Sequence, residues 1–333
     1  MTIKLSVLDQ SPISEGMNPE EALKNTVELA QFVESLGYER FWVSEHHDTY
    51  SLAGSSPEIL ITHLAAHTSK IRVGSGGVML PHYSSYKVAE NFRLLEALHP
   101  NRIDLGLGRA PGGMPRATMA LHDGKKRDVH RYPEQIDELI HYLTDSLPES
   151  HPFYGLKASP IIKTVPELWL LGSSPSSAML AAQKGLPYTF AQFINGEGGP
   201  QYTEAYINNF IPSANLKEPR NMFAVFVICA ETNEEAERIA SSIDLSLLMI
   251  EQGMESHGTP SPEKAAAYKY SSFELARVKE NRKRMVVGTP KEVKEQLLHL
   301  SEKYQTNEIM LVSITYDIQD KRKTFELIAN ELL

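Results

Sequence analysis

Residues 71–80 read IRVGSGGVML, an apolar strand-like run that holds a Gly-Ser-Gly-Gly tip. Similar runs begin at Arg40 and Arg102, so the three starts follow one another at an interval of 31 residues. A period of about thirty residues fits one strand, one crossover helix and two loops. Each run leads into a polar or glycine-rich tip. Chemistry gathered at strand ends predicts an enzyme whose site lies at one face of a parallel sheet.

Runs of this kind recur along the whole chain, with amphipathic helical patterns between most of them. Near-continuous apolar strands that alternate with such helices predict a parallel sheet covered by helices. Eight units favour a closed (β/α)8 TIM barrel over an open sheet, with residues 1–333 as a single domain. The eight runs are Ile3–Leu8, Arg40–Ser44, Ile71–Leu80, Arg102–Leu107, Glu167–Leu171, Tyr188–Phe193, Met222–Ala230 and Glu308–Thr315.

The helical patterns have apolar residues close to a period of 3.6. The first of them, Pro19–Leu36, is followed by Gly37, which is typical of a helix end. The others are Ser84–Leu98, Arg131–Leu143, Ser176–Lys184, Asn233–Ile243, Pro290–Leu300 and Lys321–Leu332.

Two segments do not fit this repeat and are predicted as insertions after strands 4 and 7 of the barrel. Residues 111–130 are rich in Gly, Arg and Lys and are expected to form a long loop. Residues 244–288 form the larger insertion, after which Thr289-Pro290 has the pattern of a helix start. Segments this long are usually functional or mobile, so either could be a lid over the active face. A peripheral decoration is an equally good interpretation of residues 244–288.

Composition excludes several classes of function. The net charge of −9 argues against nonspecific binding of nucleic acid. No apolar segment approaches the ~20 residues that span a membrane. The single cysteine, Cys229, cannot form an intrachain disulfide, and its apolar surroundings indicate a buried thiol rather than a nucleophile. A reducing cytoplasm is the expected compartment.

The tip of the second run carries Glu45, His46, His47 and Asp48. Neighbouring side chains on a strand point to opposite faces, so the two histidines cannot both enter the barrel mouth unless the strand has ended. A zinc site would need a convergent third ligand, and the helical H-E-x-x-H arrangement is absent, so no metal is expected. One histidine acting as acid/base or substrate contact, oriented by the neighbouring carboxylate, is the favoured interpretation. A hydrogen-bonded strand-end histidine without a chemical role is the alternative.

Gly76 and Gly77 lie inside a strand-like run, where glycine is costly. Such glycines indicate a bulge, or the close approach of another backbone or of a flat ligand. A dinucleotide fingerprint is not present, because Met79 stands where its third glycine is required. The Gly106-x-Gly108 pair fails in the same way, since Pro111 occupies that position.

Two further tips have residues that suit a phosphate. Arg109 follows the fourth strand beside glycines, where its guanidinium can hold an anion while the backbone approaches closely. Ser174 and Ser177 follow the fifth strand at the start of a helix, whose free N–H groups favour an anion. An ordinary surface salt bridge for Arg109 and simple helix capping for the serines are the alternatives.

Together these residues resemble the bacterial luciferase-like flavin monooxygenase superfamily. The matching pieces occur in the family's order, from the second strand to the fifth, whereas the second half of the chain matches only in its strand–helix rhythm. They are Phe41–His47, Val73–Pro81, Glu90-Asn91 with Leu94-Leu95, Arg102–Arg109 and Gly172–Ser174.

The resemblance implies a (β/α)8 barrel that binds FMN, mostly in reduced form, as a dissociable cosubstrate from a separate flavin reductase. By this similarity His46 matches the catalytic histidine beside the flavin, and Glu45 would support it. Gly76-Gly77 matches a pair that packs on the flavin ring, often through a non-proline cis peptide. Arg109, Ser174 and Ser177 match positions that hold the phosphate.

The resemblance further implies that reduced FMN and O2 oxygenate a small organic substrate. A deazaflavin-dependent hydride transferase, or a flavin-binding protein without catalysis, are the alternatives. Gly108 replaces the reactive cysteine of the light-emitting luciferases, so light emission is not expected. Family members commonly dimerise through the helices at Pro57–Thr68 and Ser84–Leu98, so a homodimer is expected.

Overall fold

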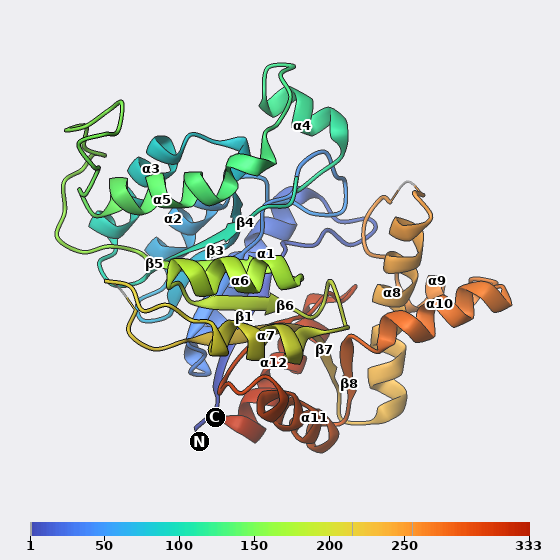
Figure 1. Cartoon of the computed structure of the whole chain (residues 1–333). Coiled ribbons are helices and arrows are strands. Elements are labelled where there is room, and N and C mark those ends of the chain that lie inside the picture. Colours follow the sequence, from blue (N-terminus) through green and yellow to red (C-terminus); the bar gives the residue numbers. More distant parts are fainter. Residues whose placement is uncertain (1, 215, 255) are drawn as a thin grey trace.

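Eight parallel strands close into a barrel in the computed structural model, which describes residues 2–214, 216–254 and 256–333 (Figure 1). The hydrogen-bonded order is β6-β5-β4-β3-β2-β1-β9-β7, and pairing of β6 with β7 closes the ring. The predicted (β/α)8 barrel is therefore confirmed, and each of its strands overlaps one of the eight runs. The strands are β1 (Lys4–Asp9), β2 (Arg40–Val43), β3 (Arg72–Met79), β4 (Ile103–Gly108), β5 (Glu167–Gly172), β6 (Tyr188–Ala191), β7 (Asn221–Cys229) and β9 (Glu308–Val312).

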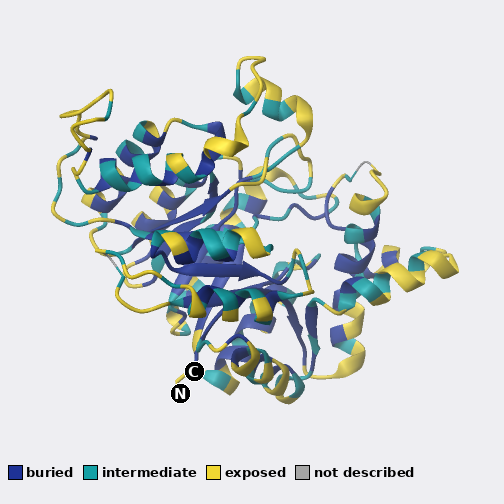
Figure 2. Ribbon diagram, viewed as in Figure 1, coloured by how far each residue is buried: buried dark blue, intermediate teal, exposed yellow. Residues whose placement is uncertain are grey.

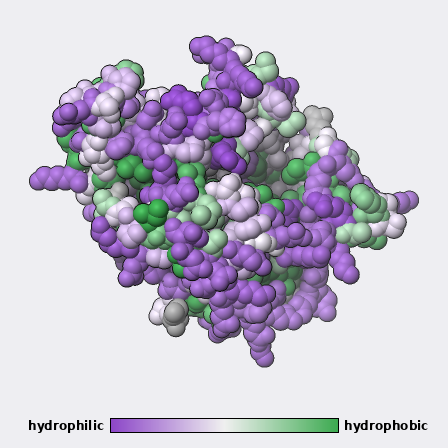
Figure 3. All heavy atoms as spheres, viewed as in Figure 1, coloured by the Kyte–Doolittle hydropathy of each residue, from purple (hydrophilic) through white to green (hydrophobic). Residues whose placement is uncertain are grey.

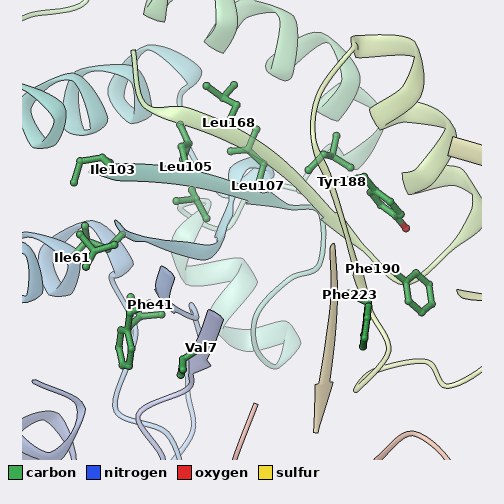
Figure 4. Packing of buried hydrophobic residues seen from close by; sticks show 14 of the residues in the cluster. Val7, Phe41, Ile61, Ile103, Leu105, Leu107, Leu168, Tyr188, Phe190 and Phe223 are labelled. Atoms are coloured by element: carbon green, nitrogen blue, oxygen red, sulfur yellow. The ribbon is translucent and has the colours of Figure 1, made fainter. Parts of the chain in front are cut away.

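Helices cover the outside of this barrel, and their apolar faces form one large core with the outward-facing strand residues. Phe41, Ile61, Leu105 and Phe223 belong to this outer core (Figure 4). Thr289 caps α11 through a capping box with Glu292, as predicted from the Thr-Pro pair. The surrounding helices are α1 (Pro19–Ser35), α2 (Pro57–His67), α3 (Ser85–Leu98), α5 (Tyr132–Leu143), α6 (Pro175–Lys184), α7 (Gly199–Asn208), α11 (Pro290–Lys303) and α12 (Ile318–Leu332).

The segment after β4 is not a plain loop. Residues 111–130 contain the short helix α4 (Pro115–Leu121), and a 3₁₀ turn, η2 (Val129–Arg131), begins near their end. No residue of α4 is buried, and the helix projects from the body of the molecule (Figure 2). The backbone of this segment is nevertheless tied to the barrel, because the His47 N–H donates to the Gly112 carbonyl over 2.8 Å.

The segment after β7 is more regular than predicted. Helix α8 (Asn233–Glu251) does not end at Ile243, because apolar residues continue at helical spacing through Leu247 and Leu248. Two further helices follow, α9 (Pro262–Ala267) and α10 (Ser272–Arg282).

The last residues of the predicted insertion form a strand of the sheet, β8 (Met285–Gly288). This strand pairs with Phe226–Cys229 in the second half of β7, whereas β6 pairs with Asn221–Ala224 in the first half. β8 therefore continues the wall beyond the point where β6 ends. The interpretation of residues 244–288 as one irregular insertion is wrong for this part.

Two tryptophans fill the barrel interior opposite a row of glycines. Trp42 of β2 and Trp169 of β5 are fully buried and meet edge to face, with ring centroids 5.6 Å apart. Between them, β3 and β4 carry Gly74 and Gly106. A Cβ at Gly74 would lie 2.9 Å from Trp42 Cδ1, and one at Gly106 would lie 2.8 Å from Leu171 Cδ1. Trp42 and Leu171 therefore use volume that the two glycines leave free.

A cluster of ion pairs fills the N-terminal end of the barrel. Arg40, at the start of β2, is 1% exposed and donates to Asp104 over 2.6 Å and to Glu308 over 2.5 Å. Arg220 extends the cluster by donating to Glu167 over 2.6 Å. Burial lowers the pKa of Arg40, but Asp104 and Glu308 raise it above its ordinary value. The other end, which carries the strand tips, is the open one.

Within the described residues, no helix combines the length and the apolar character that crossing a membrane requires.

Candidate active site

The predicted tips come together because their strands are neighbours in register. Val43 of β2 pairs with Ser75 of β3, Gly76 of β3 pairs with Gly106 of β4, and Leu107 of β4 pairs with Leu170 of β5. Parallel strands lie about 4.8 Å apart. The residues that follow these pairs therefore share one edge of the barrel, with the tip of β3 between those of β2 and β4.

His46 lies at the tip of β2 and is held by two polar contacts. Its backbone N–H donates to the Gly54 carbonyl over 2.9 Å, and its Nδ1 lies 3.0 Å from Ser44 Oγ. Burial, together with the neighbouring His47, lowers the pKa of His46 to about 4. The imidazole is thus neutral at pH 7. When Ser44 donates to Nδ1, the Nε2–H of His46 is a donor toward the opening.

Glu45 does not orient His46, so that part of the prediction is wrong. Its fully buried carboxylate accepts from Nε2 of His47 over 2.8 Å, from the Met79 backbone N–H over 2.9 Å and from the Tyr83 hydroxyl over 2.7 Å. Ser44 and His46 share one face of the chain, and Glu45 and His47 share the other, as the two-residue period of a strand requires. Glu45 therefore fastens the end of β3 to the tip of β2.

The glycine pair at the tip of β3 has a structural cause within the chain. The β3–β4 register shifts between Gly76 and Val78, which is the bulge anticipated from the sequence. The Gly76–Gly77 peptide is cis. A Cβ at Gly76 would lie 2.6 Å from Leu8 Cδ1, and one at Gly77 would lie 2.7 Å from the Gly106 carbonyl oxygen. Close approach of another backbone accounts for Gly77, and the tip of β3 is lined by bare peptide.

Arg109 follows β4 and is exposed. In the described part of the chain its side chain has no hydrogen-bond or ion-pair partner, so it is not in the surface salt bridge that the sequence left open. A second guanidinium lies beside it, because Arg127 Nη2 donates to the carbonyls of Arg109 over 2.5 Å and Ala110 over 3.0 Å. Burial and the charge of Arg109 both lower the pKa of Arg127. Arg127 could not be predicted from the strand tips, since it lies eighteen residues beyond Arg109 in the chain.

A buried hydroxyl completes this cationic region. Tyr132, the first residue of α5, is 2% exposed, and its OH group has no hydrogen-bond partner among the described residues. Burial raises the pKa of Tyr132, and the positive charge of Arg109 opposes that rise. A buried hydroxyl without a partner is costly, and an anion held by Arg109 could supply that partner.

Ser174 and Ser177 begin α6 and form a capping box. Ser174 Oγ accepts from the Ser177 N–H over 3.4 Å, and Ser177 Oγ donates to the Ser174 carbonyl over 2.7 Å. Ser177 Oγ also lies 3.1 Å from the Tyr188 hydroxyl. The geometry shows the helix capping that was the alternative to an anion site. The remaining free N–H groups of this helix end still favour an anion beside the tip of β5.

His82 connects the segment after β4 to the end of β3. Its Nε2 donates to the Pro111 carbonyl over 2.8 Å, which leaves Nδ1 to accept from Nε2 of His122 over 3.0 Å. Burial lowers the pKa of His82, as do the charges of Arg127 and His122. These two contacts tie Pro111 and His122 of the segment after β4 to the end of β3.

Among the described residues, no group of three or more His, Cys, Asp or Glu side chains could hold a metal ion. The histidines at this face instead pair with hydroxyl, carbonyl and carboxylate groups and, for His82 and His122, with each other.

Comparison with known proteins agrees with this arrangement. The sequence model of the luciferase-like monooxygenase family matches residues 3–306. The chain is 40% identical to N-acetyl-S-alkylcysteine monooxygenase of Bacillus subtilis (strain 168), over 99% of this chain and 98% of that protein. The crystal structure of apo-MsnO8 superposes with a TM-score of 0.91 at 39% identity, over 99% of this chain and 98% of that one.

A more distant likeness concerns the fold alone. The oxygenating constituent of 3,6-diketocamphane monooxygenase from Pseudomonas putida, solved in complex with FMN, superposes with a TM-score of 0.75 at 19% identity, over 99% of this chain and 98% of that one. The family match, which extends far beyond the strand tips, agrees with the resemblance seen in the sequence. The chain belongs to the luciferase-like monooxygenase family and is an oxidoreductase of that family.

Proposed function

We propose that this protein uses reduced FMN and O2 to oxygenate a small organic substrate at the open end of its barrel. The observation that carries the proposal is the pair Arg109 and Arg127, because the Arg127 guanidinium is held at the Arg109 backbone carbonyl and neither side chain has a carboxylate partner among the described residues. Cations held together in this way are typical of an anion site. The unpaired Tyr132 hydroxyl and the start of α6 fit the same ligand.

The residues present therefore fit FMN. Arg109 and Arg127 would hold the phosphate, together with Ser174 and Ser177 at the start of α6. The bare peptide at Gly76-Gly77 would lie against the flat ring system, because no side chain projects there. FMN, when bound and reduced, supplies the electrons that activate O2.

The protein's own chemistry centres on His46. Its neutral imidazole can hold or pass a proton at Nε2, and Ser44 sets the ring orientation through Nδ1. Glu45 acts indirectly, by holding the backbone of Met79 and the ring of His47 in place. Solvent access would let the reduced oxygen leave as hydrogen peroxide, so shielding of the opening matters. The α4 segment and α8–α10 flank that end and are the candidates for such a lid (Figure 1).

FMN is proposed to be a dissociable cosubstrate that a separate flavin reductase supplies. The exposure of Arg109 supports exchange, because the phosphate site is reached from solvent. The relative that acts on N-acetyl-S-alkylcysteine makes thioethers the first substrates to screen. We also infer a cytoplasmic location, for which the lone Cys229 is suited, since burial raises the pKa of its thiol to about 12 and keeps it unreactive.

A homodimer is part of the proposal. Ile59 of α2 and Leu94 and Leu98 of α3 are 70%, 53% and 56% exposed. Exposed apolar side chains gathered on two adjacent helices favour burial against a second copy. The face seen in Figure 3 is mostly hydrophilic with small hydrophobic areas, as expected of a protein exposed to water.

Anaerobic mixing of the reduced-FMN complex with O2 tests the proposal. Flavin reoxidation is expected to differ from that of free reduced FMN, and His46→Ala is expected to remove the difference. If flavin bound to the wild type reoxidised at the same rate as free reduced FMN, the proposal would be contradicted. Preference for a deazaflavin over FMN in equilibrium binding would indicate the hydride-transferase alternative. Tight binding of oxidised FMN without substrate-dependent O2 uptake would indicate a flavin-binding protein without catalysis.

A further inference from the structure

Three methionine side chains are exposed in the part of the chain that the structure describes, and two of them belong to the segment after β4. Met114, the N-cap of α4, is 63% exposed, and Met119, near the end of α4, is 59% exposed. The third, Met254, follows α8. A methionine carries a thioether, which oxidants convert to a sulfoxide. The same functional group occurs in S-alkylcysteines, which give one relative its name.

Met114 is held beside the tip of β2 by contacts on both sides of it in the chain. Before it, Gly113 forms a parallel β-bridge with His47, and a Cβ at Gly113 would lie 2.6 Å from the His47 carbonyl oxygen. After it, the guanidinium of Arg116 is paired with both carboxylate oxygens of Asp48. Met114 is therefore fixed next to the strand tip that carries the histidine proposed to hold or pass a proton.

Two other methionines of this region are placed differently. Met119 is about as exposed as Met114, but it lies about 7 Å further along the helix axis at the rise of an α-helix, beyond the contact that Arg116 makes. Met79, at the tip of β3, is partly buried, and its sulfur packs against β4, because a Cβ at Gly108 would lie 2.9 Å from Met79 Sδ. Met114 thus combines an exposed sulfur with a fixed place at the strand tips.

We propose that Met114 is a site of self-modification, at which the protein converts its own thioether to the sulfoxide when no small substrate occupies the opening. This inference rests on the proposed function for the supply of reduced FMN and O2. The Met114 sulfur binds one atom of O2 and gives up two electrons, and the O–O bond breaks. The second oxygen atom leaves as water, with two electrons and two protons from reduced FMN. A polar sulfoxide then replaces an apolar thioether at the edge of the opening.

Mass spectrometry of the protein after turnover without substrate tests the inference. Reduced FMN is added to the protein anaerobically, O2 is admitted, and catalase destroys the hydrogen peroxide that escapes; the cycle is repeated, and each methionine peptide is scored for the gain of one oxygen atom. Oxidation at Met114 is expected to exceed that at Met119 by about tenfold, because a group held beside the reacting centre has a much higher effective concentration. Hydrogen peroxide without FMN should oxidise the two residues to similar extents, since their exposures are nearly equal.

The stereochemistry of the sulfoxide gives a second readout. The sulfoxide sulfur is chiral, and a separate reductase acts on each epimer. Oxygen delivered to Met114 from one direction is expected to give mainly one epimer, so that only one of the two reductases restores the thioether, whereas free peroxide gives both epimers. Equal amounts of the two epimers at Met114, or oxidation mainly at Met119 or Met79, would overturn the inference.

Two matched substitutions test the position of Met114. Asp48 has a φ of 54°, a left-handed conformation that Asn also adopts, so Asp48→Asn removes the charge and is expected to keep the turn. Loss of the ion pair with Arg116 should free α4 and lower the ratio of Met114 to Met119 oxidation toward the value with hydrogen peroxide. Glu331→Gln removes an exposed ion pair between α11 and α12, and the ratio should persist. An unchanged ratio in Asp48→Asn, or an equal fall in both variants, would contradict the inference.

The rate of flavin reoxidation, recorded in the same mixtures, separates this inference from the proposed function. If the protein changes that rate but Met114 and Met119 are oxidised equally, the self-modification fails and the proposed function stands. If flavin reoxidises as in free solution, but Met114 is still oxidised selectively and to one epimer, the proposed function fails and the modification site stands. Free-solution reoxidation without selective oxidation of Met114 would overturn both.

Discussion

Nε2 of His47 donates to the buried carboxylate of Glu45 over 2.8 Å, whereas His46 turns to Ser44. Glu45 is thus a positioning residue, and its other partners are the Met79 backbone and the Tyr83 hydroxyl. Three donors converge on one carboxylate that has no contact with solvent.

Glu45→Ala is therefore expected to lower the free energy of unfolding by about 2–4 kcal/mol, because it leaves buried donors without an acceptor. Tyr83→Phe removes only one of those donors and should cost about 1 kcal/mol. Urea unfolding followed by circular dichroism measures both. Equal stability of Glu45→Ala and the wild type would show that the network does not hold the strand ends together.

The lowered pKa of His46 predicts that the protein loses stability in mild acid. Its pKa is about 4 in the folded protein, below the ordinary value of 6.5, so the unfolded chain binds the extra proton between those two values. The contribution of His46 is fully present above pH 6.5 and falls by at most about 3 kcal/mol as the pH approaches 4. The free energy of unfolding, measured from pH 7.5 to 4.5, should decline less in His46→Gln than in the wild type. His63→Gln, at an exposed histidine, is the control. If stability declined as little in His63→Gln as in His46→Gln, the acid dependence could not be assigned to His46.

Arg109 is expected to recognise the phosphate of FMN. Arg109→Gln should weaken FMN binding about tenfold to a hundredfold and leave riboflavin binding unchanged, because riboflavin has no phosphate. Fluorescence titration of both flavins gives the ratio. Arg116→Gln is a matched control, since Arg116 is exposed and its guanidinium is paired with Asp48. A parallel loss of riboflavin affinity in Arg109→Gln would assign Arg109 to some other part of the flavin.

Arg127 should make FMN association dependent on salt. Two unpaired cations attract an anion at a rate that ionic screening reduces. Stopped-flow quenching of FMN fluorescence from 20 to 300 mM salt should show a falling association rate, and Arg127→Gln should show a shallower fall. An unchanged slope in this variant would mean that Arg127 serves only to hold the carbonyls of Arg109 and Ala110.

The exposed side chain of Leu94 allows a test of the proposed homodimer. Leu94→Asp places a charge on the exposed face of α3, so a dimer formed through that face should dissociate. Sedimentation velocity at micromolar concentration is expected to give a dimer for the wild type and a monomer for the variant. Ile161→Asp, at another exposed apolar side chain, should remain dimeric. A monomeric wild type would remove the dimer from the proposal.

The barrel could be predicted because buried parallel strands leave apolar runs that alternate with amphipathic helical patterns, and three of these runs start 31 residues apart. β8 cannot be predicted from the repeat, because it is a ninth strand that lies outside the eight strand–helix units of the barrel. The length of α8 was underestimated at Ile243, although Leu247 continues the same helical face. Helix and strand boundaries are thus predicted wrongly where hydrophobic periodicity is the only signal and the segment is short or irregular.

Side-chain partners were harder to predict than strands. The Glu45–His47 pair could have been predicted, because residues two apart on a strand share a face. Arg127 had no such signal, since its approach to Arg109 depends on how residues 111–130 fold back. His82 fixes that path through contacts with Pro111 and His122, which no local sequence pattern shows.

The ion pairs around Arg40 also replace apolar packing at one end of the barrel. Arg40 and Asp104 are buried there, and Trp42 and Trp169 fill the interior above them, so the barrel is a solid core and not a channel. A substitution of Arg40 would leave carboxylates buried without their cation, and its cost would fall on the stability of the whole barrel.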